Sequence, residues 1–378
     1  MGNVAHFAYK AHAYERIDKT VASRYKVGMR IGRGCYGIVF DAYKYEEEET
    51  PVAIKKILGA FRNVTDAQRT YREVMYLRGL NGHENIVELK DVICSTDDLH
   101  LYLIFERMHA SLATALRTRA LSPIHRDLIV YQVCRALKWI HSASVMHRDV
   151  TPSNILLTKQ AAVKLADFGW ARDTPVYDEH HPMTDYAGTR WYRAPEVIFG
   201  ARHYTEAVDL WALGCITGEI YSNSPLIGGS SNIDMIEKMI ELTGKPLAAD
   251  VVAMDCPNAE LAMEPIPPGP PHKSIEARFP DQGPEMHDFM ALLIQWNPQK
   301  RLSSSEALTH PFLGAHHNPD DEPAMGHQVQ LDLADSEQVS TNWYRDQIYA
   351  DAIGIKSAKV KVEMHRRHAM DEVYEKLG

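Results

Sequence analysis

The pattern of hydrophobic and polar positions divides the chain into two parts. Between Arg24 and Met108, short runs alternate between hydrophobic and polar residues or are rich in β-branched ones, which predicts strands. One segment, residues 65–80, instead repeats its hydrophobic residues at helical spacing, with Thr65 or Asp66 as the expected N-cap. Residues 1–24 show no clear period and are interpreted as an extension. The first part is therefore predicted to be a β-rich lobe with one helix.

After Met108 the hydrophobic spacing becomes helical. Residues 126–143, 207–221 and 285–296 each repeat hydrophobic side chains every three or four positions. The stretch Met254–Pro271 is rich in proline and is interpreted as irregular. A β-rich part followed by a helical part predicts an α+β protein of two lobes, with a cleft between them as the expected ligand site.

Composition narrows the function classes. The net charge of −9 gives no general electrostatic footprint for nucleic acid, so we expect no nucleic-acid partner. The five cysteines are scattered singly, which favours neither a zinc site nor a disulfide framework and fits a reducing compartment. No run of about 20 apolar residues and no signal-peptide pattern is found, so we expect no membrane partner and a cytoplasmic location, with the nucleus left open.

A glycine-rich segment begins the candidate chemistry. Gly32, Gly34 and Gly37 have the spacing G-x-G-x-x-G, followed by Val39. Glycines allow a tight turn and let backbone N–H groups approach phosphates. Glycine loops are common, so this pattern alone equally fits an ordinary turn.

Four further motifs follow in order. Val52-Ala53-Ile54-Lys55 ends an apolar run with a lysine that needs a carboxylate partner, and Glu73 on the predicted helix fits that role. The segments His147–Asn154, Asp167–Gly169 and Ala194–Glu196 have the patterns H-R-D-x-x-x-x-N, D-F-G and A-P-E. Each could arise by chance, but all of them in this order make a coincidental match very improbable.

From Arg24 to about Leu313 the chain resembles eukaryotic protein kinases. The resemblance implies a small β-rich N-lobe over 25–108 and a larger helical C-lobe over 109–313, with ATP in the cleft between them. It also implies Asp149 as the acceptor of the substrate hydroxyl proton, Lys55 and Glu73 as the phosphate-positioning pair, and Asn154 and Asp167 as Mg²⁺ ligands. The implied ATP-binding residues are Ile31, Gly32, Gly34, Cys35, Gly37, Val39, Ala53, Lys55, Phe105, Glu106 and Met108. Asp209 would brace the catalytic loop, and Arg301 would pair with Glu196.

Thr184-Asp185-Tyr186 resembles the activation motif of mitogen-activated protein kinases, and the surrounding segments are most similar to the atypical extracellular-signal-regulated branch. The resemblance implies phosphorylation of Thr184 and Tyr186, by the protein itself or by an upstream mitogen-activated protein kinase kinase. It implies three arginines for the first phosphate and two for the second, namely Arg72, Arg148 and Arg172, then Arg190 and Arg193.

Residues 314–378 are expected to form a docking site and a C-terminal extension that packs back onto the lobes. Asp320, Asp321 and Glu322 are similar to the group's docking site for basic peptides, although a solvated loop is the open alternative. Substrates are expected to carry proline after the phosphorylated serine or threonine.

One residue departs from the pattern. Thr151 stands where serine/threonine kinases carry a lysine that contacts the γ-phosphate, and losing a charge there could cost a few kcal/mol. The sequence therefore predicts an active serine/threonine kinase, with a catalytically weak scaffold that binds ATP and partners as the alternative.

Overall fold

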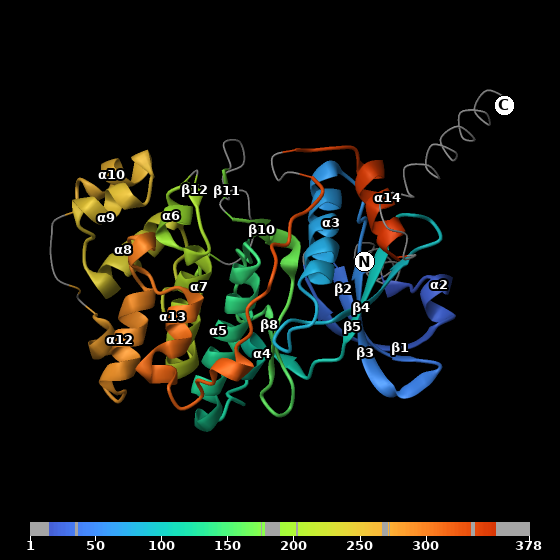
Figure 1. Ribbon diagram of the computed structural model, residues 1–378, viewed down its shortest axis with the longest axis horizontal. Helices are drawn as coiled ribbons and strands as arrows, with labels where there is room; N and C mark the ends of the chain where they lie inside the picture. The colour runs from blue at the N-terminus through green and yellow to red at the C-terminus, as the bar shows by residue number, and fades with distance from the viewer. Residues whose placement is uncertain are drawn as a thin grey trace, which may run out of the picture. The chain divides into compact units, whose positions relative to one another are not determined.

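The computed structural model describes residues 15–34, 37–174, 176–177, 190–201, 203–266, 271, 273–333 and 337–352. The chain forms two compact units (Figure 1). Unit 1 is discontinuous and consists of Met1–Asn81, Glu88–Arg107 and Glu337–Gly378. Unit 2 consists of Gly82–Val87 and Met108–Ser336. Unit 1 is a β-sheet lobe and unit 2 is a helical lobe, which is the predicted α+β architecture.

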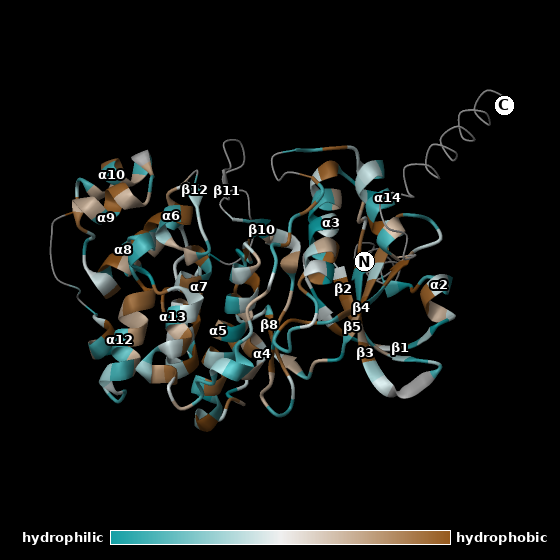
Figure 2. Cartoon of the chain, viewed as in Figure 1, coloured by the Kyte–Doolittle hydropathy of each residue, from teal (hydrophilic) through white to brown (hydrophobic). Residues whose placement is uncertain are grey.

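Unit 1 is built on one antiparallel sheet with strand order β1-β2-β3-β5-β4. Its strands are β1 (Tyr25–Arg33), β2 (Gly37–Lys44), β3 (Glu47–Ile57), β4 (Leu89–Cys94) and β5 (Leu101–Glu106). β5 lies between β3 and β4, and its residues from Leu101 to Phe105 are all buried. Figure 2 colours these strands by hydropathy and shows hydrophobic residues mixed with hydrophilic ones along them.

Two helices of unit 1 differ from the expectations. Helix α3 (Val64–Gly79) begins after Asn63, whose side chain accepts the Asp66 N–H, so neither Thr65 nor Asp66 is the cap. Helix α2 (Lys19–Ala22) lies within the presumed extension, and its Val21 is fully buried in the core of the sheet. A single buried valine with no repeat around it leaves no periodic signal, which is why the sequence did not predict this contact.

Unit 1 is completed by α14 (Thr341–Ala352), which packs against α3. The rings of Tyr71 and Trp343 meet edge to face at 5.4 Å, and Tyr344 is fully buried. Arg78 Nε also lies 3.0 Å from Asp351 Oδ2. The segment expected to pack back onto the lobes is thus divided: its described residues from 337 on belong to unit 1, and those before 334 belong to unit 2.

Unit 2 packs α5 and α12 against α7, in which every residue from Val208 to Gly218 is buried. The helix bounds are α4 (Leu112–Arg117), α5 (Arg126–Ser142), α6 (Pro195–Ile198), α7 (Ala207–Ser222), α8 (Asn232–Thr243), α9 (Ala248–Ala253), α10 (Pro257–Met263), α11 (Ile275–Arg278), α12 (Pro284–Leu293) and α13 (Ser304–Thr309), with short 3₁₀ turns at Pro123–His125, Phe168–Trp170, Pro298–Lys300, Pro311–Leu313 and Pro319–Asp321. Helix α10 lies inside the stretch interpreted as irregular. Pro257 stands at its start, where proline is tolerated because its missing N–H is not needed.

Short strands position the loops of unit 2. The sheet β6-β8-β9 pairs β6 (Ala110–Ser111), β8 (Ile155–Leu157) and β9 (Val163–Leu165), while β7 (Val145–Met146) pairs with β10 (Arg172–Asp173) and β11 (Val176–Tyr177) with β12 (His203–Tyr204). Ile155 pairs with Leu165, so the residues just before β8 and just after β9 are neighbours.

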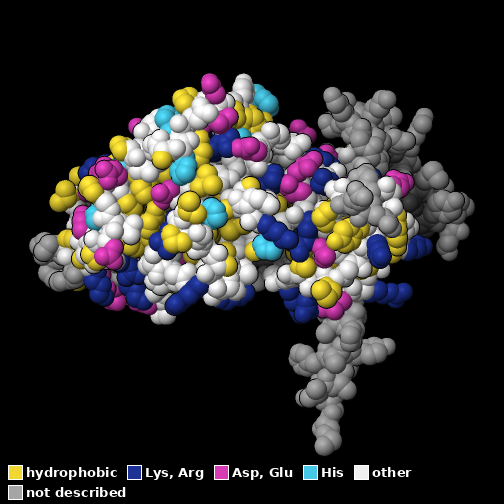
Figure 3. All heavy atoms as spheres, turned by 90° about the horizontal axis from the view of Figure 1, so that it is seen from below, with side chains coloured by type: hydrophobic (Ala, Val, Ile, Leu, Met, Phe, Trp, Pro, Cys, Tyr) yellow, Lys and Arg dark blue, Asp and Glu magenta, His cyan; other side chains and the backbone are white. Residues whose placement is uncertain are grey.

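The surface shows no separation of charge by sign on the face drawn in Figure 3, where acidic and basic side chains are interspersed. Within the described ranges, the helices are too short or too polar to cross a bilayer.

Candidate active site

The glycine-rich segment ends β1 and begins β2. Gly32 pairs with Val39, and the Gly34 N–H donates to Gly37 O at 3.0 Å. A Cβ on Gly37 would lie 2.3 Å from Lys56 O, so only glycine lets β2 approach β3 this closely. Ile31 is partly exposed at the end of β1, and Cys35 lies outside the described residues.

Lys55 and Glu73 form an ion pair within unit 1. Lys55 stands on β3 opposite Val39 and Leu103, and its Nζ lies 2.5 Å from Glu73 Oε1 on α3. The lysine side chain is 18% exposed and that of Glu73 only 4%. A pocket of about 260 Å³ adjoins the pair, so the lysine can be reached by a ligand while its carboxylate partner is held by the helix.

The predicted adenine-binding residues fall on both units. Ala53 and Phe105 are paired across β3 and β5, and both are buried. The carboxylate of Glu106 accepts the Glu88 N–H at 2.9 Å, so this side chain is used to hold the start of β4. Met108 is buried and is the first residue of the second segment of unit 2.

The catalytic-loop carboxylate is held by the amide that ends its motif. Asn154 Nδ2 donates to Asp149 Oδ2 at 2.8 Å and to the Asp149 carbonyl at 2.9 Å. Both amide hydrogens thus point to Asp149, which turns the amide oxygen of Asn154 away from it. The Ala166 N–H donates to Asn154 O at 2.9 Å and brings the segment of Asp167 alongside.

A buried carboxylate fixes the backbone of the loop. Asp209 of α7 accepts the N–H groups of His147 and Arg148, each at 2.8 Å, and contacts His141 Nε2 at 3.0 Å. Burial alone would raise the pKa of Asp209, but these hydrogen bonds and the neighbouring histidines lower it below its usual range. Arg148 has φ 68°, which is a strained backbone conformation for any residue other than glycine. The hydrogen bonds to Asp209 hold the backbone in this conformation. The bracing role implied for Asp209 is confirmed.

His147, a motif residue to which the sequence assigned no role, connects two motifs. Its Nδ1 accepts the Asp149 N–H at 3.3 Å, and its Nε2 lies 3.1 Å from Ala166 O. Burial lowers the pKa of His147, so the ring is neutral with the proton on Nε2. The ring also meets Phe168 edge to face at 4.7 Å. One side chain therefore links the H-R-D and D-F-G segments.

Two side-chain oxygen atoms near the catalytic loop suit Mg²⁺ as ligands. Asp167, with φ 64°, follows β9 and offers a carboxylate, while Asn154 offers its amide oxygen. Magnesium prefers oxygen ligands and takes one or two carboxylates together with phosphates and water. Over the described residues, no three His, Cys, Asp or Glu side chains converge as a metal cage, so these two oxygens remain the candidate ligands.

The five predicted phosphate-binding arginines are described, but Thr184 and Tyr186 lie outside the described residues. Arg72 is buried on α3 of unit 1, whereas the other four belong to unit 2. The guanidinium of Arg148 lies over the Tyr204 ring at 5.2 Å, Arg172 Nη1 donates to Ala171 O, and Arg190 Nη1 donates to Ser230 O. The structure therefore shows protein contacts of Arg148, Arg172 and Arg190, and the phosphate role of the five arginines stays a prediction.

The pairing implied for Arg301 and Glu196 is confirmed. Two parallel contacts of 2.6 and 2.7 Å join the guanidinium to the carboxylate, and the side chains are 0% and 1% exposed. The remaining N–H groups of Arg301 donate to the carbonyls of Gln295, Trp296 and Ala207. This closed pair fixes the end of the A-P-E motif.

The predicted docking acids do not form one group. Asp320 and Asp321 are exposed, but Glu322 is buried and accepts from Tyr131, His317 and the Asn318 N–H. Burial would raise the pKa of Glu322, and the hydrogen bonds lower it overall. Glu322 therefore differs from its two acidic neighbours, because its carboxylate holds the segment onto α5, and the docking role of the three residues stays a prediction.

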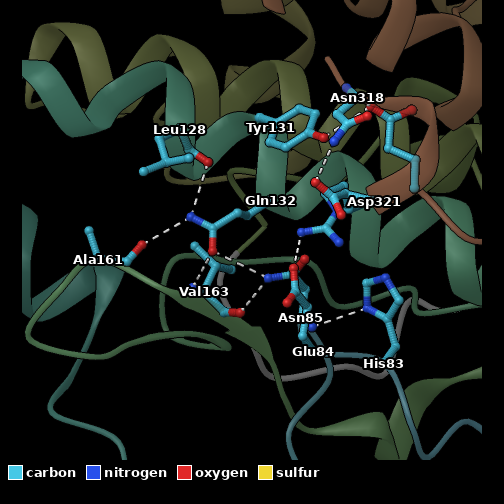
Figure 4. A network of polar contacts seen from close by, with 12 residues as sticks. His83, Glu84, Asn85, Leu128, Tyr131, Gln132, Ala161, Val163, Asn318 and Asp321 are labelled. Carbon is cyan, nitrogen blue, oxygen red and sulfur yellow. Dashed lines mark hydrogen bonds and ion pairs between the residues drawn. The ribbon is translucent and has the colours of Figure 1, made fainter. Parts of the chain in front are cut away.

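Figure 4 shows how this segment joins the rest of unit 2. Asn318 donates to Asp321 at 2.6 Å, and Tyr131 next to them is followed on α5 by Gln132. Gln132 accepts the Val163 N–H of β9 and contacts Asn85. Helix α5 thus connects the docking segment to the strand that leads into Asp167.

Comparison with known proteins places these features in a family. Residues 25–313 match the protein kinase domain. The chain is 42% identical over 351 residues to Extracellular signal-regulated kinase 2 of Dictyostelium discoideum, covering 92% of this chain and 95% of that protein. It is 38% identical over 358 residues to Mitogen-activated protein kinase 15 of Caenorhabditis elegans, covering 93% and 76%. Extracellular signal-regulated kinase 7 of Drosophila melanogaster is 36% identical over 350 residues, covering 90% of this chain and 38% of that protein. Nothing in these relatives favours the scaffold alternative.

Proposed function

Because the chain belongs to the protein kinases, and within them to the atypical extracellular-signal-regulated branch of the mitogen-activated group, we propose that it phosphorylates serine or threonine directly before proline. Serine/threonine kinase activity follows from the family, as does the general use of ATP and Mg²⁺. The observation that carries the residue assignment is the grip of Asn154 on Asp149, since it positions a carboxylate and leaves an amide oxygen for a cation.

Each residue then has one task in phosphoryl transfer. Asp149 accepts the proton of the substrate hydroxyl as its oxygen attacks the phosphorus. Asp167 and Asn154 would hold Mg²⁺, which would supply positive charge to neutralise the phosphates. Lys55 binds the phosphate oxygens of ATP, and Glu73 holds its ammonium in position.

We further propose that phosphorylation of Thr184 and Tyr186 activates the enzyme. Each phosphate adds a charge of about −1.5 to −2 and strong acceptor oxygens. Arginine forks suit such groups because they bind two oxygens at once. Three of the five arginines would bind the phosphate on Thr184, and two would bind the phosphate on Tyr186. The phosphates would be added by the protein itself or by an upstream kinase. The five arginines are Arg72, Arg148, Arg172, Arg190 and Arg193.

Asp320 and Asp321 support a proposal about partners. Both carboxylates are exposed, so a basic docking peptide could pair with them, whereas Glu322 is withdrawn from solvent. We expect Asp321→Asn to weaken binding of a basic peptide with little change in stability. Glu322→Gln should instead lower stability, because it weakens three internal hydrogen bonds. A cytoplasmic location, with the nucleus open, stays a prediction.

The test uses the full chain, treated with phosphatase and incubated with Mg-ATP and two peptides that differ only in proline or alanine after the serine. We expect kcat/KM to be at least about tenfold higher for the proline peptide, a difference of ~1.4 kcal/mol. Asp149→Asn keeps the shape of the side chain and an acceptor for Asn154 but cannot take the proton, so it should lose transfer. Equal use of both peptides would refute the proline preference, and full activity of Asp149→Asn would refute the assignment of the base.

A further inference from the structure

The end of strand β5 is held by side-chain contacts on both of its sides. The carboxylate of Glu106 accepts the Glu88 N–H at 2.9 Å, which ties this end to the residue before β4. In the opposite direction, Arg107 Nε donates to Asp41 Oδ1 of β2 at 2.7 Å. Because the strand order is β1-β2-β3-β5-β4, β4 is the neighbour of β5 on one side and β2 lies beyond β3 on the other. Residues 106 and 107 are therefore held from two directions within unit 1.

The contact between Arg107 and Asp41 spans three strands. Asp41 is paired with Ala53 of β3, and Ala53 is paired with Phe105 of β5. Arg107 stands two residues beyond Phe105, so its side chain reaches back past β3 to meet β2. The hydrogen bonds of a β-ladder join only neighbouring strands. The ion pair therefore adds a direct link between β2 and the end of β5 that the ladder itself does not provide.

This link adjoins the residues that are predicted to bind ATP. Alternate residues of a strand lie on one face of a sheet, and so do cross-strand partners. Asp41 therefore shares a face with Val39 and Ala53, which are both predicted to line the nucleotide site. Arg107 directly follows Glu106, the predicted adenine-binding residue at the end of β5. Each member of the ion pair thus stands next to predicted ATP-binding residues without being one of them.

A second ion pair of unit 1 provides a comparison. Arg24 Nη2 lies 2.8 Å from Asp91 Oδ2 of β4, and these side chains are 51% and 24% exposed, against 25% and 30% in the first pair. Asp91 is paired with Ile104, which lies in the hydrophobic cluster on the opposite face of the sheet from Ala53. The two ion pairs have similar lengths but different locations, so comparing them separates the effect of location from that of charge pairing itself.

We propose that Arg107 and Asp41 are positioning residues of the nucleotide site. Their ion pair holds the end of β5 at a set distance from β2, so that the residues predicted to bind adenine are ordered before the nucleotide arrives. Without the pair, the cost of ordering this segment would offset part of the binding free energy. The inference rests on the proposed kinase function and adds to it two residues that the kinase motifs do not contain.

The direct test measures binding of adenosine and of Mg-ADP, which share the adenine and the ribose but not the phosphates. In the phosphatase-treated full chain, both dissociation constants are measured by competition with a fluorescent ADP. We expect Asp41→Ala to weaken both ligands by the same factor, about three- to fivefold, which is the range of a partly exposed ion pair. Asp91→Ala is the matched control, because it breaks the comparison pair and should leave both constants unchanged.

Variants of the partner residue separate the ion pair from an effect of Asp41 alone. Arg107→Leu removes the charge but keeps an apolar side chain, so it should weaken both ligands as much as Asp41→Ala does. The double variant should weaken them no further, because the two substitutions break the same contact. Arg107→Lys keeps the charge and should retain most of the affinity. In peptide phosphorylation, Asp41→Ala should raise KM for ATP by the same factor, with kcat within about twofold of the wild type.

Several outcomes would overturn the inference. These are unchanged constants in Asp41→Ala, weaker binding of Mg-ADP alone, equal weakening in Asp91→Ala, or additive losses in the double variant. If the wild type phosphorylates the peptide but its nucleotide affinity does not depend on the ion pair, the inference fails and the proposed function stands. If the affinity depends on the pair but no phosphate is transferred, the proposed function fails alone. A wild type that binds neither adenosine nor Mg-ADP contradicts both.

Discussion

Two ion pairs, one in each unit, show how differently the same chemistry can be used. Lys55 Nζ lies 2.5 Å from Glu73 Oε1, next to a pocket of about 260 Å³. Arg301 and Glu196 meet through two contacts in a site that excludes solvent, and all five N–H groups of the arginine are satisfied. The first pair keeps a charge available to a ligand, whereas the second leaves no donor for anything but the protein itself.

The difference follows from the surroundings of the two cations. A lysine ammonium is a compact point charge on a flexible stem, so it can exchange one partner for a phosphate. The guanidinium of Arg301 is planar, lies over the Trp211 ring at 5.2 Å and matches the carboxylate in two places. We therefore expect the pair in unit 1 to matter for catalysis and the pair in unit 2 for stability.

The largest expected effect comes from breaking the closed pair. Glu196→Ala leaves the Arg301 charge buried without its carboxylate, which should lower the free energy of unfolding by about 3–5 kcal/mol. Urea unfolding of wild type and variant gives this difference directly. If the variant does not fold, Glu196→Gln, which keeps one acceptor, provides a milder version. A change below about 1 kcal/mol in both variants would contradict the comparison.

Breaking the pair of Lys55 and Glu73 should instead reduce activity and leave stability nearly unchanged. Lys55→Met is expected to reduce kcat about 10²–10³-fold, because it removes a charge from the phosphates, while the midpoint of thermal unfolding changes little. Asp167→Ala should behave alike, since it removes a Mg²⁺ ligand. Steady-state assays with the proline peptide, together with thermal unfolding, provide both readouts. Near wild-type turnover in either variant would show that the assignment is wrong.

A buried histidine in unit 2 predicts that stability depends on pH. His83 stacks on Trp139 and accepts the Asn85 N–H, and burial together with the Arg135 charge lowers its pKa to about 4. As pH falls from 6.5, the unfolded chain binds a proton before the folded one, so stability declines. Between pH 6.5 and 5 the decline from this group should be about 2 kcal/mol. His83→Asn keeps an acceptor for Asn85 and should flatten the curve; parallel urea-unfolding curves of the two proteins would exclude the effect.

The smallest expected effect concerns position 151 in the otherwise unchanged protein. Thr151→Lys should not lower kcat/KM and can raise it, because it adds a cation at the position where the family carries a lysine that contacts the γ-phosphate. We expect a change within about tenfold, or ~1.4 kcal/mol. A larger decrease in the peptide assay would show that the threonine itself is adapted to this site.

Sequence reasoning worked where chemistry is local and fell short where burial decides. The motifs predicted that Lys55 stands on a strand and that Asp167 follows one, because each of these motifs adjoins an apolar run that forms the strand. Glu322 was grouped with its acidic neighbours, since charge alone cannot tell an exposed carboxylate from one bound by Tyr131 and His317. The link through His147 depends on a ring placed between two segments that only the folded chain brings together.

The position of α14 has a consequence for how the protein is made. This helix covers the Tyr71 side of α3, yet Thr341–Ala352 follows the whole of unit 2 in the chain. On a ribosome the sheet of unit 1 is synthesised first, but its covering helix emerges only after every residue of unit 2. Domains generally fold as units while they emerge. The helical lobe can thus be complete while the nascent β-lobe still exposes aromatic surface, which makes that interval the natural moment for a chaperone to bind.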